Sequence, residues 1–361
     1  VVNEDFIIKP IDGFGDRDLI RVTLATEKPD ILFIFTDPRF FIWLFEMEDE
    51  VHQVCPIVWW HVWDNYPYPA FNSSLYEATD MINCHSHMTY TMLKDRFSEK
   101  TNFIPHSIPE NIFYKISEHE KKVQKSAILG PDRKDHFTAF WVNRNAKRKR
   151  PNDVILSWKI FLDLLEEQTG KRDATLVMHT DPYDQEGPNL IMTAESLDVH
   201  NNVFFSTERL EFDKMNILYN IADVTINISY AEGFGLSTLE SMQTGTPIIA
   251  AKTGGLTRQA VDHRDGSENG VALDIDCKSL VGSQQVPYIY EDYVKPESTA
   301  EALLKIYNMS PEEREKLSEK VSNYVKSEFS HQGTVDAWHE SLLDVHENWK
   351  ERYKRWECFT M

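Results

Sequence analysis

Short hydrophobic runs alternate along this chain with longer stretches whose apolar positions recur at helical spacing. A first series of strand-like runs lies at 31–35, 56–62, 81–84 and 102–104. A second series begins after position 136, with runs at 137–142, 175–179, 203–206, 224–228, 247–251 and 271–274. Helical patterns lie between the runs, at 87–97, 153–167, 214–221, 236–244 and 257–261. Runs rich in Val and Ile that alternate with helices are typical of parallel sheets covered on both faces, so the pattern predicts two doubly wound α/β domains.

The segment 118–135 separates the two series, because it is charged in its first part and rich in turn residues in its second. We therefore expect a first domain over residues 1–130, a second over 131–329 and a C-terminal helical segment over 330–361. The first domain is expected to be incomplete at its start, because no convincing strand and helix frame the DGFGD motif at 12–16.

The region from position 297 onward has helical periodicity, with Pro311 at the start of one helix. The last helix, at about 334–356, carries Trp338, Trp349 and Trp356. A helix exposed only to solvent would not need three tryptophans, so we expect it to pack on another element.

The charge balance excludes some function classes. Thirty-eight Lys and Arg against 58 Asp and Glu give a net charge of −20, which argues against general nucleic-acid binding and leaves at most peripheral contact with an anionic membrane. The longest apolar runs fall far short of the roughly 18 residues that a membrane span needs. The four cysteines form no CxxC pair, which argues against a zinc ribbon or disulfide framework and favours a reducing, cytoplasmic location.

The most informative segment is 226–256, INISYAEGFGLSTLESMQTGTPIIAAKTGGL. A buried strand is followed by a loop with Gly233 and Gly235, and then by a helix. The N–H groups of Leu236, Ser237 and Thr238 would lie free at the helix start, where partial positive charge favours a phosphate group. The end of a parallel strand is also where open α/β sheets bind ligands.

Two carboxylates, Glu232 and Glu240, bracket this predicted anion site. Carboxylates repel phosphate, so they are better suited to accept hydrogen bonds from hydroxyl groups. A phosphate flanked by hydroxyls on both sides describes a nucleotide sugar, with a ribose on one side and a hexose on the other.

Taken together, EGFGLSTLE, then TGTP, then GGL resembles the signature of retaining glycosyltransferase family 4. The resemblance implies a GT-B fold, in which two Rossmann-like domains face each other across a cleft and C-terminal helices follow. It implies a hexosyltransferase that moves a hexose from a UDP- or GDP-linked donor to a glycan, a lipid-linked or another hydroxyl acceptor. It implies no cofactor and no metal, so Asp274 and Asp276 are not expected to bind one. His85 and His87 are not expected to bind a metal either, because they lack the i, i+4 spacing of a helical pair.

The resemblance also assigns site residues. In NRNAKRKRP, Arg144 and Lys149 match the family's two cations on the donor diphosphate, with Lys147, Arg148 and Arg150 as close rivals. His61 would face the donor sugar from the first domain. The remaining donor contacts are Glu232, Gly233, Phe234, Gly235, Leu236, Ser237 and Thr238 around the sugar and diphosphate, Glu240 on the ribose, and Leu210 near the base.

Other readings stay open. Where the family has Pro-Glu after GGL, this chain has Thr257 and Arg258. A nucleotide-sugar epimerase on the same fold, an inactive glycan-binding homologue and a sugar transferase acting on DNA are the alternatives, and the net charge argues against the last. The base, the sugar, the acceptor and the oligomeric state are undetermined, and the insert at 277–296 fits either a lid or a partner surface.

Overall fold

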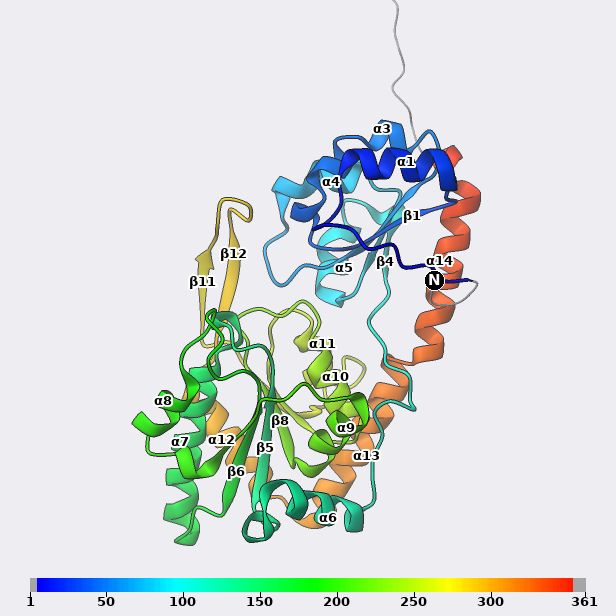
Figure 1. Ribbon diagram of the computed structural model, residues 1–361. Helices are drawn as coiled ribbons and strands as arrows, with labels where there is room; N and C mark the ends of the chain where they lie inside the picture. The colour runs from blue at the N-terminus through cyan, green and yellow to red at the C-terminus, as the bar shows by residue number, and fades with distance from the viewer. Residues whose placement is uncertain (1–4, 353–361) are drawn as a thin grey trace, which may run out of the picture.

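The computed structural model describes residues 5–352, which form two lobes (Figure 1). The N-terminal lobe contains a four-stranded sheet in the order β1-β2-β3-β4. All its strands are parallel, and they span β1 (Leu32–Thr36), β2 (Ile57–His61), β3 (Met81–Cys84) and β4 (Thr101–Phe103). Apart from the partly exposed Trp60, the apolar side chains of β2 and β3 are almost completely buried, as their continuous hydrophobic runs predict.

The helices of this lobe are α1 (Arg17–Glu27), α2 (Ile42–Phe45), α3 (Glu48–Val51), α4 (Ser73–Glu77) and α5 (His87–Lys94). The first of them corrects the sequence analysis, which found no helix beside the DGFGD motif. Helix α1 begins directly after that motif, because the Asp16 side chain accepts a hydrogen bond from the Leu19 N–H and caps the first turn.

The C-terminal lobe is built on a six-stranded parallel sheet in the order β10-β9-β8-β5-β6-β7. The strands are β5 (Phe137–Val142), β6 (Ala174–His179), β7 (Val203–Ser206), β8 (Val224–Asn227), β9 (Ile248–Ala251) and β10 (Gly270–Leu273). Its helices are α7 (Pro151–Thr169), α8 (Leu190–Ser196), α9 (Phe212–Ile221), α10 (Leu236–Gln243), α11 (Leu256–Ala260) and α12 (Pro296–Tyr307). Trp158 and Phe161 of α7 pack against the sheet together with Trp141 of β5, and all three side chains are fully buried.

The strand order reverses at β5, which lies between β8 and β6. At such a switch point the loops that follow neighbouring strands diverge, and the space between them holds the ligands of open α/β sheets. The fold therefore places the basic loop after β5 next to the glycine loop after β8.

Two further helices, α6 (Glu118–Leu129) and α13 (Pro311–Glu328), pack on the C-terminal lobe, and the last one, α14 (His331–Arg352), crosses to the N-terminal lobe (Figure 1). Helix α14 runs back along the N-terminal lobe (Figure 1). Its Trp338 ring meets Phe33 and Trp60 at 5.1 Å each, and Trp349 packs with Val58 in a buried cluster. Trp338 and Trp349 thus pack against another element, as expected, whereas Trp356 lies outside the described residues. The domain boundaries expected from the sequence stay predictions.

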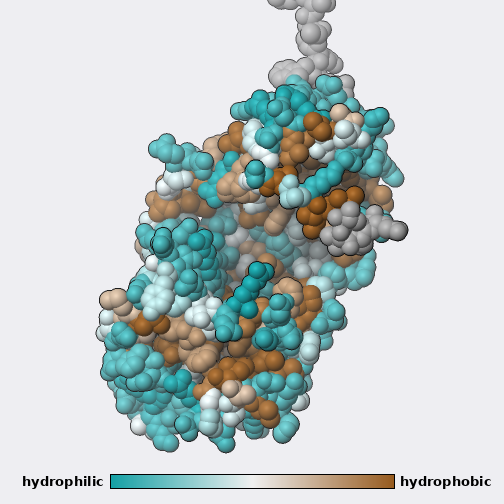
Figure 2. All heavy atoms as spheres, viewed as in Figure 1, coloured by the Kyte–Doolittle hydropathy of each residue, from teal (hydrophilic) through white to brown (hydrophobic). Residues whose placement is uncertain are grey.

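The segment after position 276 forms an antiparallel hairpin of β11 (Cys277–Val281) and β12 (Ile289–Tyr293). The hairpin rises from the C-terminal lobe beside the N-terminal one (Figure 1). Figure 2 shows the two lobes from the same side, with the surface hollowed between them. Among the helices of residues 5–352, none combines the length and the apolar character needed to cross a bilayer.

Candidate functional site

Two loops meet at the switch point, one after β5 and one after β8. The Tyr230 N–H donates to the carbonyl oxygen of Arg148 over 2.9 Å, which ties the loops together. Arg148 Nη1 donates to the carbonyl oxygen of Ala231 over 2.5 Å. These bonds position the residue that follows, Glu232, against the cations of the basic loop.

Glu232 is the centre of the charge cluster at this site. Lys149 Nζ donates to Glu232 Oε2, Ser229 Oγ lies 3.3 Å from the same oxygen, and Arg148 Nη1 lies 3.9 Å from Oε1. The Glu232 side chain is only 11% exposed. Burial alone would raise the pKa of Glu232, but the two cations and the hydrogen bonds outweigh burial and hold that pKa below its usual value. Glu232 is therefore a buried, ionised hydrogen-bond acceptor.

The N-terminal lobe closes against this cluster at Gly233. A Cβ at Gly233 would lie 2.9 Å from Asp64 Oδ1 and 3.1 Å from His85 Nε2, so only glycine fits without displacing them. Arg148 Nη1 also lies 3.5 Å from Asp64 Oδ2. Arg148 thus stands between a carboxylate of each lobe, and the site is formed by both.

The start of α10 is shaped for close approach. Gly235 has a φ of 94°, and a Cβ there would lie 2.5 Å from Leu256 Cδ2. Leu236 is 46% exposed, so the first turn of the helix is accessible and its N–H groups can face an anion. The Thr238 hydroxyl is not available, because it donates within the core to the Gly235 carbonyl oxygen or the Gln259 side chain and is fully buried. Any contact of Thr238 with a ligand therefore falls to its backbone.

Phe234 likewise turns its side chain inward. Its ring packs edge-on against His106 at 4.9 Å and against Phe329 at 5.7 Å. Ser237 is partly exposed in the same first turn. The glycine loop therefore presents mainly backbone groups to the space between the lobes.

Glu240 lies about one turn into α10 and is held by the Tyr219 hydroxyl, which donates to Glu240 Oε2. Burial raises the pKa of Glu240 to about 7 despite this hydrogen bond. Leu210 packs against the hydrophobic cluster that contains Tyr219. The ribose and base residues expected from the sequence thus adjoin the same cluster.

Two expected residues are not brought to the Glu232 cluster. Arg144 is 60% exposed and pairs with Asp184, with its Nε 2.8 Å from Asp184 Oδ2. The His61 imidazole is fully buried in the N-terminal lobe, where its Nε2 lies 2.8 Å from the Tyr76 hydroxyl oxygen. The expectation that His61 faces the cleft is corrected here, because strand alternation turns His61 to the same face as Trp59, into the core.

The structure brings forward residues that the sequence analysis did not assign to the site. His85 follows β3 and faces Gly233, while its Nδ1 lies 2.7 Å from the His61 carbonyl oxygen. Asp64 follows β2 in the WWHVWD segment. Both stand just beyond the end of a parallel strand, and that position is the signal by which they could have been found.

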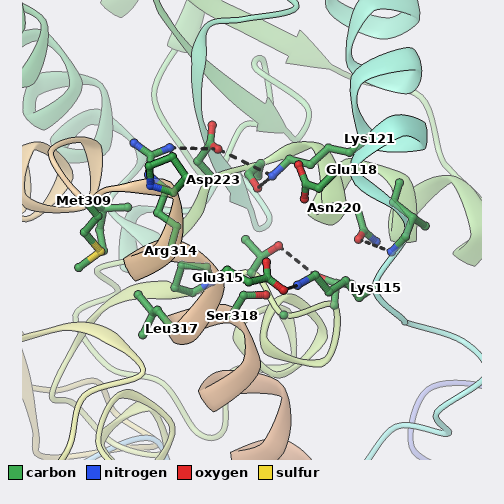
Figure 3. Close-up of a pocket in the computed structure, with 18 residues that line it drawn as sticks. Lys115, Glu118, Lys121, Asn220, Asp223, Met309, Arg314, Glu315, Leu317 and Ser318 are labelled. Carbon is green, nitrogen blue, oxygen red and sulfur yellow. Dashed lines mark hydrogen bonds and ion pairs between the residues drawn. The ribbon is translucent and has the colours of Figure 1, made fainter.

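A second cavity, of about 540 Å³, lies at the opposite end of the sheet, where Asp223 directly precedes β8 (Figure 3). Arg314 and Lys121 approach Asp223 Oδ1 to 3.6 and 3.7 Å, and Lys115 Nζ donates to Glu315 over 2.8 Å. The charges that line this cavity are thus matched internally, and it lies apart from the Glu232 cluster.

Part of the chain, including this site, is similar to known glycosyltransferases. The family model "Glycosyl transferases group 1" matches residues 125–275, which include both loops of the site. The D-inositol 3-phosphate glycosyltransferase of Acidothermus cellulolyticus is 40% identical over 89 residues, 25% of this chain and 19% of that protein. The one of Segniliparus rotundus is 32% identical over 146 residues, 40% of this chain and 31% of that protein. The matches thus span less than a third of these relatives' length.

Solved structures are similar over nearly the whole chain. HepE of Anabaena, in complex with UDP and glucose, aligns with a TM-score of 0.66 and 16% identity, covering 92% of this chain and 84% of that one. Sucrose-phosphate synthase from Thermosynechococcus elongatus aligns with a TM-score of 0.64 and 16% identity, covering 92% and 76%. The predicted two-domain GT-B fold is confirmed, and residues 125–275 of this chain are similar to the group 1 glycosyltransferases.

Proposed function

We propose that this protein is a retaining hexosyltransferase that uses a UDP- or GDP-linked hexose and a hydroxyl acceptor, without a metal ion. The observation that carries the proposal is the buried ionised Glu232, held by Lys149 and Arg148 beside the start of α10. This arrangement brings together a carboxylate that can accept hydrogen bonds from hydroxyl groups, two cations and free N–H groups. A nucleotide sugar needs all three.

The diphosphate of the donor would lie against the first turn of α10, near Gly235 and Leu236, with Lys149 and Arg148 beside it. Negative charge grows on the leaving diphosphate as the sugar departs. Preorganised cations and N–H groups stabilise that charge more in the transition state than in the ground state. Arg144 would add a third cation by leaving Asp184, since its side chain is exposed and its ion pair faces solvent.

The two carboxylates would hold the sugars on either side. Glu232 accepts hydrogen bonds from hexose hydroxyls, and Glu240 accepts them from the ribose. The HepE structure carries UDP and glucose, which supports a nucleotide and a hexose as ligands of this fold. Phosphate repels both carboxylates, so their positions favour this order of groups along the donor.

Retention would follow from attack on the face that the diphosphate leaves. The bond from the sugar C1 to the phosphate oxygen breaks, and a bond from C1 to the acceptor oxygen forms. The acceptor proton passes to the departing phosphate oxygen, so charge and atoms balance without a protein base.

Ligand-induced thermal stabilisation tests the donor assignment. Binding at about 100 times the dissociation constant should stabilise the protein by about 2.7 kcal/mol. We expect a UDP- or GDP-linked hexose to do so, and glycoside formation with retained anomeric configuration to be seen by NMR. Isomerised donor without an acceptor would instead indicate the epimerase. Donor binding without turnover would indicate an inactive homologue.

A further inference from the structure

The β11–β12 hairpin lies just beyond the segment that matches the family model, and the proposed donor site does not use it. Its pairing joins Val281 to Ile289 and Lys278 to Asp292. Because side chains alternate along a strand, the Val281 pair and Glu291 share one face of the hairpin, and the Lys278 pair shares the other.

The hairpin is fixed to the N-terminal lobe. Asn65 Nδ2 donates to the Asp292 side chain over 2.8 Å and lies 3.1 Å from the Tyr290 carbonyl oxygen. The Tyr290 N–H donates to the Tyr66 carbonyl oxygen over 2.8 Å. The Tyr288 ring meets Phe71 edge-on at 5.3 Å. These contacts make the hairpin a wall between the lobes.

A pocket of about 370 Å³ lies between this wall and the ends of β1 and β2. Val281, Ile289 and Glu291 line it from the hairpin, and Asp37 and Asp64 from the N-terminal lobe. The volume lies within the range of small-molecule sites, and it is large enough for one or two sugar rings.

The pocket opens beside the proposed donor site. Ala231 and Arg148 line its inner end, and Ala231 directly precedes Glu232. Arg148 Nη1 lies 3.9 Å from Glu232 Oε1 and 3.5 Å from Asp64 Oδ2. The Arg148 side chain therefore contacts both the pocket and the Glu232 cluster.

The backbone before Asp37 is also unusual. Thr36 has a φ of 123°, a conformation that a β-branched residue adopts only when its surroundings impose it. The Asp37 side chain accepts from the Arg39 N–H over 3.0 Å and so fixes the turn that follows β1. Held backbone of this kind is concentrated at ligand sites.

The charges of the pocket select its ligand. Arg39 pairs with Asp37 over 3.3 Å and Arg148 with Asp64 over 3.5 Å, which leaves Glu291 as an additional carboxylate. The pocket thus has more acceptors for hydroxyl groups than cations for a phosphate.

We propose that this hairpin-walled pocket is the acceptor site and that it takes a neutral, polyhydroxylated sugar ring in preference to a sugar phosphate. The inference rests on the proposed function, since it places an acceptor beside the proposed donor. Trp63 and Phe40 line the same pocket and supply apolar surface for the C–H face of such a ring.

The test compares two tryptophan substitutions on one hairpin. Ile289→Trp fills the pocket, whereas Leu280→Trp adds the same bulk on the other face, at a residue that is 59% exposed. The acceptor panel is the methyl glycosides of glucose, galactose and mannose and the corresponding hexose 6-phosphates. We expect kcat/KM for the neutral glycosides to fall at least about tenfold in Ile289→Trp and to stay within about twofold in Leu280→Trp.

Two further measurements separate this inference from the proposed function. Saturation-transfer NMR detects binding of the methyl glycosides alone, so it tests the pocket even if no donor turns over. Contact in the wild type that is lost in Ile289→Trp and kept in Leu280→Trp supports the inference. No contact in the wild type, equal contact in both variants, or a preference for the hexose 6-phosphates would overturn it. Failure of every nucleotide sugar to bind would count against the proposed function instead.

Discussion

Lys149 and Glu232 are joined by a hydrogen-bonded ion pair across the switch point between β5 and β8. The side chains are 14% and 11% exposed, so water screens the pair little. Lys149 lies in the loop after β5 and Glu232 in the loop after β8, and both loops lie at the same edge of the sheet because the strands are parallel. The pair therefore fixes a cation and a carboxylate at the place where the fold binds ligands.

Lys149→Ala should lower kcat/KM with the best nucleotide sugar by about 10²–10³. The reason is the loss of a preorganised cation where charge develops on the leaving diphosphate. Steady-state kinetics measures the effect, and a thermal unfolding curve separates it from loss of fold. Lys147→Ala is the matched control, because Lys147 is an exposed lysine of the same loop. Equal losses in the two variants would show that kcat/KM depends on the overall positive charge of the loop and not on the position of Lys149.

Arg144→Ala tests whether the exposed arginine takes part in catalysis. If Arg144 leaves Asp184 to bind the diphosphate, the variant should lose about a hundredfold or more in kcat/KM. Asp184→Asn should then lower KM for the donor, because it weakens the competing ion pair. Wild-type turnover by Arg144→Ala would remove Arg144 from the mechanism and leave the role to Arg148.

Patterns of hydrophobicity predicted most of the fold. The strands at Met81–Cys84, Phe137–Val142 and Val203–Ser206 have the expected bounds, because continuous apolar runs between turn residues define buried parallel strands. Helix α1 was missed because it is short and its polar residues outnumber its apolar ones, and Leu24 is the one residue in it that is buried. The hairpin was missed because its residues are only partly buried and lack the marked alternation of a half-buried strand.

The site was predictable only as far as the backbone determines it. Gly235 and Glu232 follow from the strand–loop–helix pattern of their segment. The choice between Arg144 and Arg148 depends on a short 3₁₀ turn at Lys147–Lys149, which brings both Arg148 and Lys149 to Glu232, whereas Arg144 pairs with Asp184. His85 replaces His61 opposite Gly233 because of strand alternation in β2, which the aromatic run around His61 obscured.

Gly254→Ala should disrupt the backbone packing between the lobes and destabilise the protein. An added Cβ would lie 2.1 Å from the Glu232 carbonyl oxygen and 2.4 Å from that of Asp64. Since both are backbone atoms, the loops themselves must move, and we expect a loss of about 2–3 kcal/mol in the free energy of unfolding. Gly266→Ala is the control: Gly266 also has positive φ, but a Cβ there meets nothing within 4 Å. That variant should lose only the conformational cost of about 1–2 kcal/mol. Chemical denaturation measures both, and equal losses would contradict the close packing at Gly254.

Donor affinity should depend on pH through Glu240, whose pKa burial raises to about 7. Ribose hydroxyls donate hydrogen bonds, so the bound nucleotide favours the ionised carboxylate. The dissociation constant for UDP-glucose should therefore fall by up to about tenfold from pH 6 to pH 8. UDP-glucose is the suitable probe because its diphosphate has no ionisation near neutral pH. Calorimetric titration across this range measures the effect.

Glu240 should also make the free energy of unfolding of the unliganded protein depend on pH. Because the pKa of Glu240 is higher in the folded than in the unfolded chain, the folded state keeps a proton that the unfolded state has lost. Neutral Glu240 contributes its full share to the free energy of unfolding at pH values below the pKa of the unfolded chain. This contribution decreases as the pH rises towards about 7. Glu240→Gln should remove both this decrease and the pH dependence of UDP-glucose binding. Glu195→Gln, at an exposed glutamate on α8, should change neither. A Glu240→Gln protein whose affinity for UDP-glucose still rose from pH 6 to pH 8 would assign the titration to another group and leave the ribose contact without support.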